Sequence, residues 1–132
     1  ITRIERELKK IQCRFYPYHY QRGVHRIRKV AFVHGFTANM ASVKQHAEIF
    51  AEPGGAVCMG HIHRIEAVNA IRHGGAKGYS GGCICDIEKM TYAHHRTATA
   101  RWEHGWLYGV IGTGGEYKIW QSEKVGKVWM HP

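Results

Sequence analysis

The stretch Cys58-Met59-Gly60-His61-Ile62-His63-Arg64 decides the fold that we expect for this chain. A short apolar run ends there abruptly in glycine and histidine, and Ala31-Phe32-Val33-His34-Gly35 repeats the arrangement upstream. Apolar runs of about four residues bounded by glycine are typical of buried strands. In α/β proteins, ligands bind beyond the carboxyl ends of such strands. His34, His61 and His63 are therefore candidate ligand-binding residues at one edge of a sheet.

The spacing of these histidines favours a metal site. Side chains two residues apart in extended backbone point the same way, so His61 and His63 are expected to converge. Gly35 and Gly60 lack a Cβ and are expected to leave room for a close approach. Three imidazoles from two neighbouring strand ends suit a transition-metal ion. For each one taken alone, the alternative is a structural histidine whose ring nitrogens are hydrogen-bonded within the protein.

The residues between the two runs predict a helical crossover. Ser42 with Gln45 three residues later is a capping-box pattern that opens a helix extending through Ala51. Pro53-Gly54-Gly55 then ends it. A strand–helix–strand unit of this kind makes its two strands parallel, and we expect them to be neighbours with their carboxyl ends on one edge.

At this point the sequence resembles a known family. Val33-His34-Gly35, the predicted helix and Gly60-His61-Ile62-His63-Arg64 resemble the last two signature motifs of the calcineurin-like metallophosphoesterases. Gly82-Cys83-Ile84-Cys85-Asp86 and Arg101-Trp102-Glu103-His104-Gly105-Trp106 resemble the C-terminal region of phage-type members. The resemblance extends from about residue 24 to the end. It implies the α/β class, with residues 1–132 forming the C-terminal half of a four-layer α/β/β/α sandwich with a mixed sheet and a strand-rich C-terminal region.

The resemblance also implies a dinuclear centre that hydrolyses phosphate esters. Two divalent transition-metal ions clamp the ester in this family, and Mn, Fe, Zn and Ni all remain open as their identity. His34 and His61 would bind one ion and His63 the other. Arg64 and His104 are the candidate substrate-binding residues. The alternatives are a salt bridge of Arg64 in the neighbourhood of Glu66 and a hydrogen-bonded core histidine at position 104.

The sequence departs from the family in its first three motifs. It contains no Asp-x-His, no Gly-Asp and no Asn-His, so the bridging aspartate, the asparagine ligand and the histidine that assists the leaving group are missing. We therefore expect a single partial domain whose catalytic residues lie in an absent N-terminal half. That half is an expected partner, and the chain alone is expected to be inactive.

Composition suggests an anionic partner. The net charge is +9 with 44% apolar residues, which indicates a globular basic protein. We expect a phosphate mono- or diester substrate and favour a nucleotide or nucleic acid. The alternatives are a non-catalytic basic nucleic-acid-binding module and a degenerate phosphoesterase subunit. The basic residues that follow three tyrosines could hold a nucleic-acid strand, but a solvated hairpin face is the preferred interpretation; these residues are Arg22, His25, Arg26, Arg28 and Lys29.

Cysteine usage and hydropathy predict a cytoplasmic protein without a membrane span. No run of about 18 apolar residues occurs. The four cysteines are scattered, which favours reduced thiols over a disulfide framework. Cys83 and Cys85 have the spacing of half a zinc site, but the second pair is missing, so buried strand cysteines are the preferred interpretation.

The remaining pattern predicts a helix followed mainly by strands. Apolar residues at helical spacing in residues 1–11 indicate an amphipathic helix lying on a sheet. A hairpin is expected across Thr113-Gly114-Gly115, and a loop over residues 86–100. The expected strands are residues 12–20, 24–33, 56–59, 65–72, 79–84, 105–112, 116–120 and 125–130.

Overall fold

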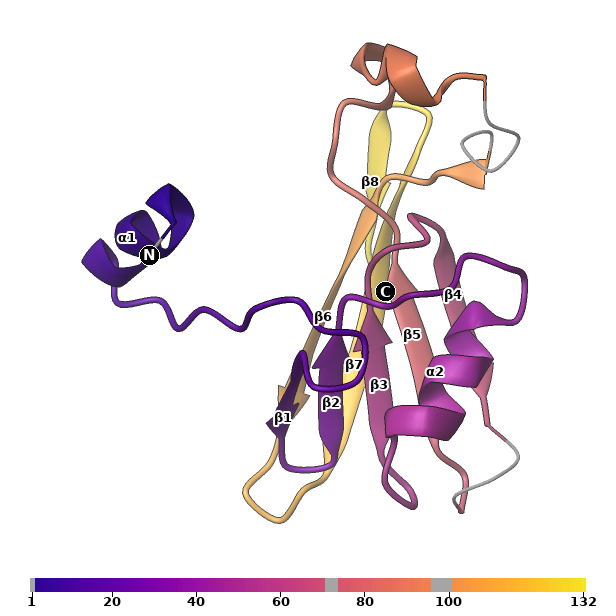
Figure 1. Cartoon of the computed structure of the whole chain (residues 1–132). Helices are drawn as coiled ribbons and strands as arrows, with labels where there is room; N and C mark the ends of the chain where they lie inside the picture. The colour runs from indigo at the N-terminus through magenta and orange to yellow at the C-terminus, as the bar shows by residue number, and fades with distance from the viewer. Residues whose placement is uncertain (1, 71–73, 96–100) are drawn as a thin grey trace.

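The computed structural model describes residues 2–70, 74–95 and 101–132. Two α-helices, two short 3-10 helices and eight strands follow one another along them (Figure 1). In chain order they are α1 Arg3–Lys10, β1 Val24–Ile27, β2 Val30–Val33, α2 Ser42–Phe50, β3 Ala56–Met59, β4 Ile65–Asn69, β5 Lys77–Gly81, η1 Ile87–Lys89, η2 Thr91–Ala93, β6 Gly105–Ile111, β7 Tyr117–Val125 and β8 Val128–Met130.

The strands form a mixed five-stranded sheet and an antiparallel three-stranded sheet. The larger sheet has the order β1-β2-β3-β5-β4, and the smaller has β6-β7-β8. β2, β3 and β5 are parallel, while β1 and β4 run antiparallel to their neighbours. This confirms an α/β protein and the predicted parallel pairing of the two histidine-bearing strands through a helical crossover. The carboxyl ends of β2, β3 and β5 lie along one edge, which we call the C-terminal edge.

The core lies on both faces of the five-stranded sheet. On one face, Val43, Ala47 and Phe50 of α2 are buried, in agreement with the apolar face expected for this helix. Val43 and Phe50 pack over β2 and β3, and Ala47 packs against Ala70 and Ala76 at the ends of β4 and β5. On the other face, Leu107 and Ile119 of the smaller sheet cover the buried side chains of β2 and β3. β3 is consequently buried along its whole length, which is why it reads as an uninterrupted apolar run.

The four-layer arrangement remains a prediction. In residues 2–70, 74–95 and 101–132 no helix covers the outer face of the smaller sheet, since none of the residues of α1 is buried. The helix itself is confirmed, and Thr2 with Glu5 forms its capping box. It does not lie on a sheet as we expected, but apart from both sheets (Figure 1). Its apolar stripe stays exposed, with Ile4 at 65% and Ile11 at 69%.

Two strand predictions near the N-terminus are wrong. Residues 12–20 form irregular backbone rather than a strand, because they do not pair with the outer side of β1. Residues 24–33 form a hairpin rather than one strand. The chain reverses at Arg28, which adopts a left-handed φ of 53°; a basic dipeptide with no glycine gave no signal for this turn.

The capping box predicted for α2 is also wrong. The N-cap is Ala41, which makes no side-chain cap. Ser42 is fully buried and its hydroxyl bonds to Thr37 and Asn39 instead. The Ser42 side chain therefore holds the loop that precedes the helix and does not cap the helix.

The C-terminal half follows the prediction with shifted boundaries. The hairpin across residues 113–115 is confirmed, but β7 runs on to Val125 and β8 begins only after a turn at Gly126. β5 spans Lys77–Gly81 rather than 79–84. The expected loop at 86–95 contains η1 and η2, while residues 71–73 and 96–100 of the predicted strand, turn and loop lie outside the described residues. Within the described ranges, no helix combines the length and apolarity needed to cross a bilayer.

His46→Ala tests how α2 holds the loop beyond β2. His46 is fully buried, its Nδ1–H donates to Ser42 O at 2.7 Å, and its Nε2 accepts from Phe36 N–H at 3.1 Å. Removing both bonds and leaving a cavity is expected to lower the free energy of unfolding by about 2–4 kcal/mol. Urea denaturation measures this, with the exposed His95→Ala as the matched control. Equal midpoints for the two variants would contradict the role assigned to His46.

Candidate metal centre

The C-terminal edge of the larger sheet gathers the candidate histidines. His34 follows β2, and Gly60 to His63 follow β3, whose last residue Met59 pairs with Val33. Because β2 and β3 are parallel and in this register, both loops start at the same level of the sheet. The predicted placement of the three histidines on one edge is therefore confirmed.

His34 and His61 lie side by side. Their ring centroids are 4.9 Å apart, with the planes inclined at 60°. Nδ1 of His34 lies 3.0 Å from the carbonyl oxygen of Gly35. A carbonyl oxygen only accepts, so Nδ1 carries the proton and Nε2 carries the lone pair. Metal-binding imidazoles ordinarily donate their other ring N–H to such a backbone carbonyl or to a similar acceptor, which fixes the tautomer.

Gly35 allows the two imidazoles to come this close. Its φ is +100°, and an added Cβ would lie 2.7 Å from Met59 Cε and 3.2 Å from His61 Cβ. Gly60, which we expected to serve the same purpose, does not. A Cβ there would meet only His34 O at 3.8 Å, an ordinary contact. One of the two predicted close approaches is thus present.

His63 does not converge with the other two. His61 and His63 both have left-handed backbone, with φ of 60° and 54°, so the rule that residues i and i+2 point the same way in a strand does not apply. The ring of His63 packs against Trp102, with centroids 4.3 Å apart and planes at 72°. Within residues 2–70, 74–95 and 101–132, no three or more His, Cys, Asp or Glu side chains lie close enough together to hold an ion. The three-histidine ligand group is therefore not preformed.

One ring nitrogen of His63 is nevertheless left without a partner. Its Nδ1 is buried and makes no hydrogen bond. Buried polar groups are nearly always bonded, and an unsatisfied one calls for an explanation such as an ion. His34, His61 and His63 together supply imidazole nitrogens, the donor type that suits divalent transition metals.

Burial keeps two of the imidazoles neutral. Burial is the main cause that lowers the pKa of His61, and the neighbouring His34 and His63 lower it further. The pKa of His63 is lowered in the same way, by burial and then by His34. A neutral imidazole keeps the lone pair that a metal ion requires, so at neutral pH these side chains are in their ligand form.

Trp102 and Glu103 hold the loop that carries His61 and His63. The Glu103 carboxylate accepts a hydrogen bond from Ile65 N–H at 2.6 Å, and Glu103 N–H donates to the carbonyl of His63 at 2.8 Å. These contacts join positions almost forty residues apart. The sequence analysis did not assign either residue to the site, and no local pattern predicts such a contact.

The two candidate substrate-binding residues are engaged elsewhere. Arg64 is only 12% exposed and bonds both Glu66 Oε2 at 3.3 Å and the carbonyl of Asn39. It therefore has a structural role in the chain as described. His104 donates from Nε2 to the carbonyl of Cys85 at 2.9 Å and lines a cavity separate from the His34–His61 pair.

Cys83 and Cys85 are not the buried strand cysteines that we expected, since both are only partly buried and lie outside the strands. Cys83 and Cys85 are free thiols whose sulfur atoms are 3.3 Å apart. Burial, followed by the bond to Cys85, raises the pKa of Cys83 to about 11. Because the thiolate is the form that binds metal, this environment disfavours a zinc ligand.

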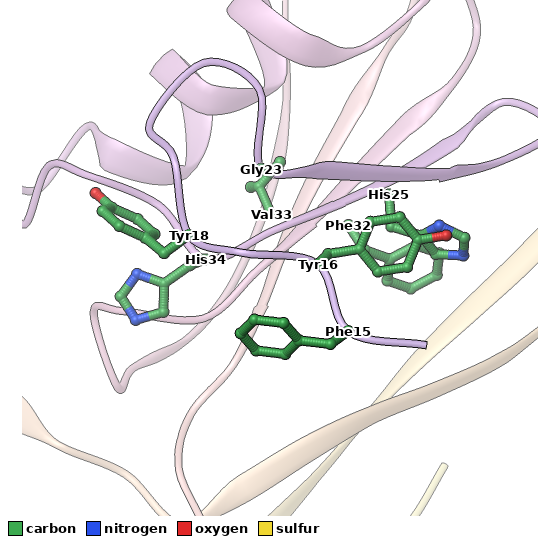
Figure 2. A pocket seen from close by; sticks show the side chains of 8 residues that line it. All are labelled: Phe15, Tyr16, Tyr18, Gly23, His25, Phe32, Val33 and His34. Carbon is green, nitrogen blue, oxygen red and sulfur yellow. The ribbon is translucent and has the colours of Figure 1, made fainter. Parts of the chain in front are cut away.

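An aromatic cavity adjoins His34. It has a volume of about 510 Å³, and Tyr16, Tyr18, His25 and His34 are among its lining side chains (Figure 2). The ring of Tyr18 meets His34 edge-on with centroids 5.3 Å apart. The sequence analysis grouped the tyrosines with basic residues but did not connect them with His34. Tyr18 lies in irregular backbone, where the sequence pattern predicted a strand.

Comparison with known proteins adds nothing to this geometry. No family model, no curated protein and no solved structure matches this chain.

Gly35→Ala is expected to disrupt the histidine pair. The left-handed φ and the contacts with Met59 and His61 should lower the free energy of unfolding by about 1–3 kcal/mol. Gly60→Ala, on the facing loop, has space for its methyl group and should change that energy by less than about 0.5 kcal/mol. Chemical denaturation of both variants makes the comparison. A Gly60 variant as unstable as the Gly35 variant would show that the described packing is wrong.

The stability of the chain should rise with pH just below 6.5. His61 and His63 have a folded pKa below the ordinary value of 6.5, so in this window the unfolded chain binds more protons. Their contribution is complete above 6.5 and is lost as the pH falls through the folded pKa. Urea midpoints from pH 5 to 7.5 should show a smaller slope in His63→Gln than in the wild type. His95→Gln is the control, and a slope unchanged in His63→Gln would contradict the shift.

Proposed function

We propose that this chain supplies the histidine ligands of a metal-dependent phosphoesterase. The single observation that carries the proposal is the His34–His61 pair, 4.9 Å apart at the C-terminal edge of two parallel strands. The tautomer of His34 fixed by Gly35 and the unpartnered Nδ1 of His63 support it. The resemblance to the calcineurin-like metallophosphoesterases suggests the reaction class, hydrolysis of a phosphate mono- or diester.

The residues present fit part of such a centre. His34 and His61 would hold one divalent ion through neutral imidazole nitrogens, and His63 would face a second. When bound, the ions polarise phosphoryl oxygens and promote ionisation of an attacking water. The protein's own contribution is to favour the neutral form of His61 and His63 through burial, to orient His34 through Gly35 and to shield His63 behind Trp102.

The two carboxylates that lie next to the histidine loop are already engaged. The acidic residue of the histidine loop region, Glu66, is paired with Arg64, and Glu103 is bonded to Ile65. Two or three imidazoles without oxygen ligands make a weak site for a divalent transition-metal ion of borderline softness. Dinuclear hydrolases also need oxygen ligands that bridge the two ions. We therefore propose that a further polypeptide segment docks at the C-terminal edge and contributes carboxylates. This is the part of the site that the missing Asp-x-His and Gly-Asp motifs would provide.

Paramagnetic metal titration tests the ligand assignment directly. Addition of Mn²⁺ to the isotopically labelled chain should broaden the imidazole resonances of His34 and His61 first. Those of His94 and His95, which are exposed and follow η2, should broaden only at much higher concentration. Uniform broadening of all imidazoles would show that the pair is not a site.

The reaction is tested on the product of the complete reading frame that encodes this chain. With Mn²⁺ and bis(p-nitrophenyl) phosphate, His61→Ala should lower kcat/KM at least about 100-fold, because a metal ligand is lost. His95→Ala should leave it unchanged. Hydrolysis that persists in His61→Ala with His63→Ala would reject both assigned roles.

A further inference from the structure

We propose that the aromatic cavity beside His34 binds an unpaired base of a single-stranded nucleic acid. Residues 15–18, whose backbone is irregular, cross over the open end of the β1–β2 hairpin and form the cavity together with it (Figure 2). At about 510 Å³ it falls in the size range of small-molecule sites and accommodates a nucleobase with part of its sugar. Its lining is almost entirely aromatic.

Three of the aromatic side chains that line the cavity are exposed to solvent. Tyr16 is 41% exposed, Tyr18 64% and Phe32 37%. Tyr16 lies 4.5 Å from the ring of His25, and His25 lies 6.2 Å from Phe32, so the three rings form one contiguous group. Exposed rings at such spacing are how proteins stack single-stranded bases without reading their sequence.

The charge of the surrounding segment selects a phosphate-bearing ligand. Residues 12–34 contain four arginines, one lysine and no acidic residue. The ion pairs among the described residues join Lys10 with Glu7, Arg64 with Glu66 and Lys89 with Asp86, so none of them neutralises this segment. Arg14 Nη1 lies 3.3 Å from Tyr16 Oη, which sets a guanidinium directly beside the cavity. A guanidinium beside an aromatic floor, in a segment with no acidic residue, is complementary to a nucleic-acid backbone.

The position of the cavity connects it with the histidine pair. His34 lines the cavity on one side and contacts His61 on the other. A base stacked on Tyr18 would therefore lie next to His34, whose ring is in turn next to that of His61. The inference that the bound nucleic acid is also the substrate rests on the proposed phosphoesterase function. The inference that the nucleic acid binds in the cavity does not depend on that function. The proposal narrows the substrate to a nucleic-acid phosphodiester.

Fluorescence anisotropy of a labelled 12-nucleotide oligothymidine tests the proposal, with EDTA present throughout. Tyr16→Ala and Tyr18→Ala should each raise Kd about 5- to 100-fold, as expected when one stacking partner is removed. Tyr16→Trp should retain the wild-type affinity. Tyr92→Ala, a tyrosine 65% exposed on η2, is the matched control and should bind as the wild type does. Circular dichroism confirms that each variant is folded.

The same variants are then tested on a duplex of equal length. Paired bases cannot enter the cavity, so Tyr16→Ala should change duplex affinity less than about twofold. An equal loss on both ligands, or no loss on either, would overturn the proposal and leave only charge attraction. Wild-type chain that sediments as a dimer, with Tyr16→Ala a monomer of unchanged oligonucleotide affinity, would overturn it in favour of a second copy as occupant.

The two proposals fail separately. Because EDTA removes divalent ions, loss of Mn²⁺ broadening at His34 and His61 leaves the binding result untouched. Conversely, selective Mn²⁺ broadening together with unchanged affinity in Tyr16→Ala would retain the metal centre and reject the base-binding cavity.

Discussion

The parallel pairing of β2 with β3 is the constraint on which the candidate site depends. Parallel neighbours require a crossover connection, and here α2 provides it while covering one face of the sheet. The pairing brings the ends of the two strands to the same level, so that residues 27 positions apart in sequence become neighbours. It also explains the uninterrupted apolar character of both strands, since the smaller sheet covers their other face. Without this register, His34 and His61 would have no reason to meet.

Two loops leave this edge, and each is held by a side chain from a distant element. His46 of α2 anchors the loop after His34 by accepting from Phe36 N–H. Glu103, which precedes β6, anchors the loop after β3 by accepting from Ile65 N–H. Both ring nitrogens of His46 and the carboxylate of Glu103 are bonded to other parts of the chain. The Nδ1 of His63, in contrast, is buried without a partner. The histidines that satisfy the fold and those available to a ligand are thus different residues.

The sequence predicted those features that depend on local patterns. The crossover, the buried strands and the glycine hairpin all follow from apolar runs, helical spacing and turn residues. The turn at Arg28 and the left-handed backbone at His61 and His63 have no such signal, because non-glycine residues rarely adopt positive φ. Residues 12–20 alternate like a strand but do not pair with β1, and alternation alone does not provide a hydrogen-bonding neighbour. The role of Glu103 depends on a long-range contact, which no window of sequence contains.

The same limits explain why the three candidate ligands were only partly placed. Sequence reasoning assumed extended backbone through Gly60, and on that assumption His61 and His63 would face one point. The chain instead turns at both histidines, so one ring meets His34 and the other meets Trp102. His34 therefore becomes the residue that connects the functional features of the chain: it contacts His61 on the histidine side and Tyr18 on the aromatic side. If a ligand held at one side changes the affinity for a ligand at the other, thermodynamic reciprocity makes the effect equal in both directions.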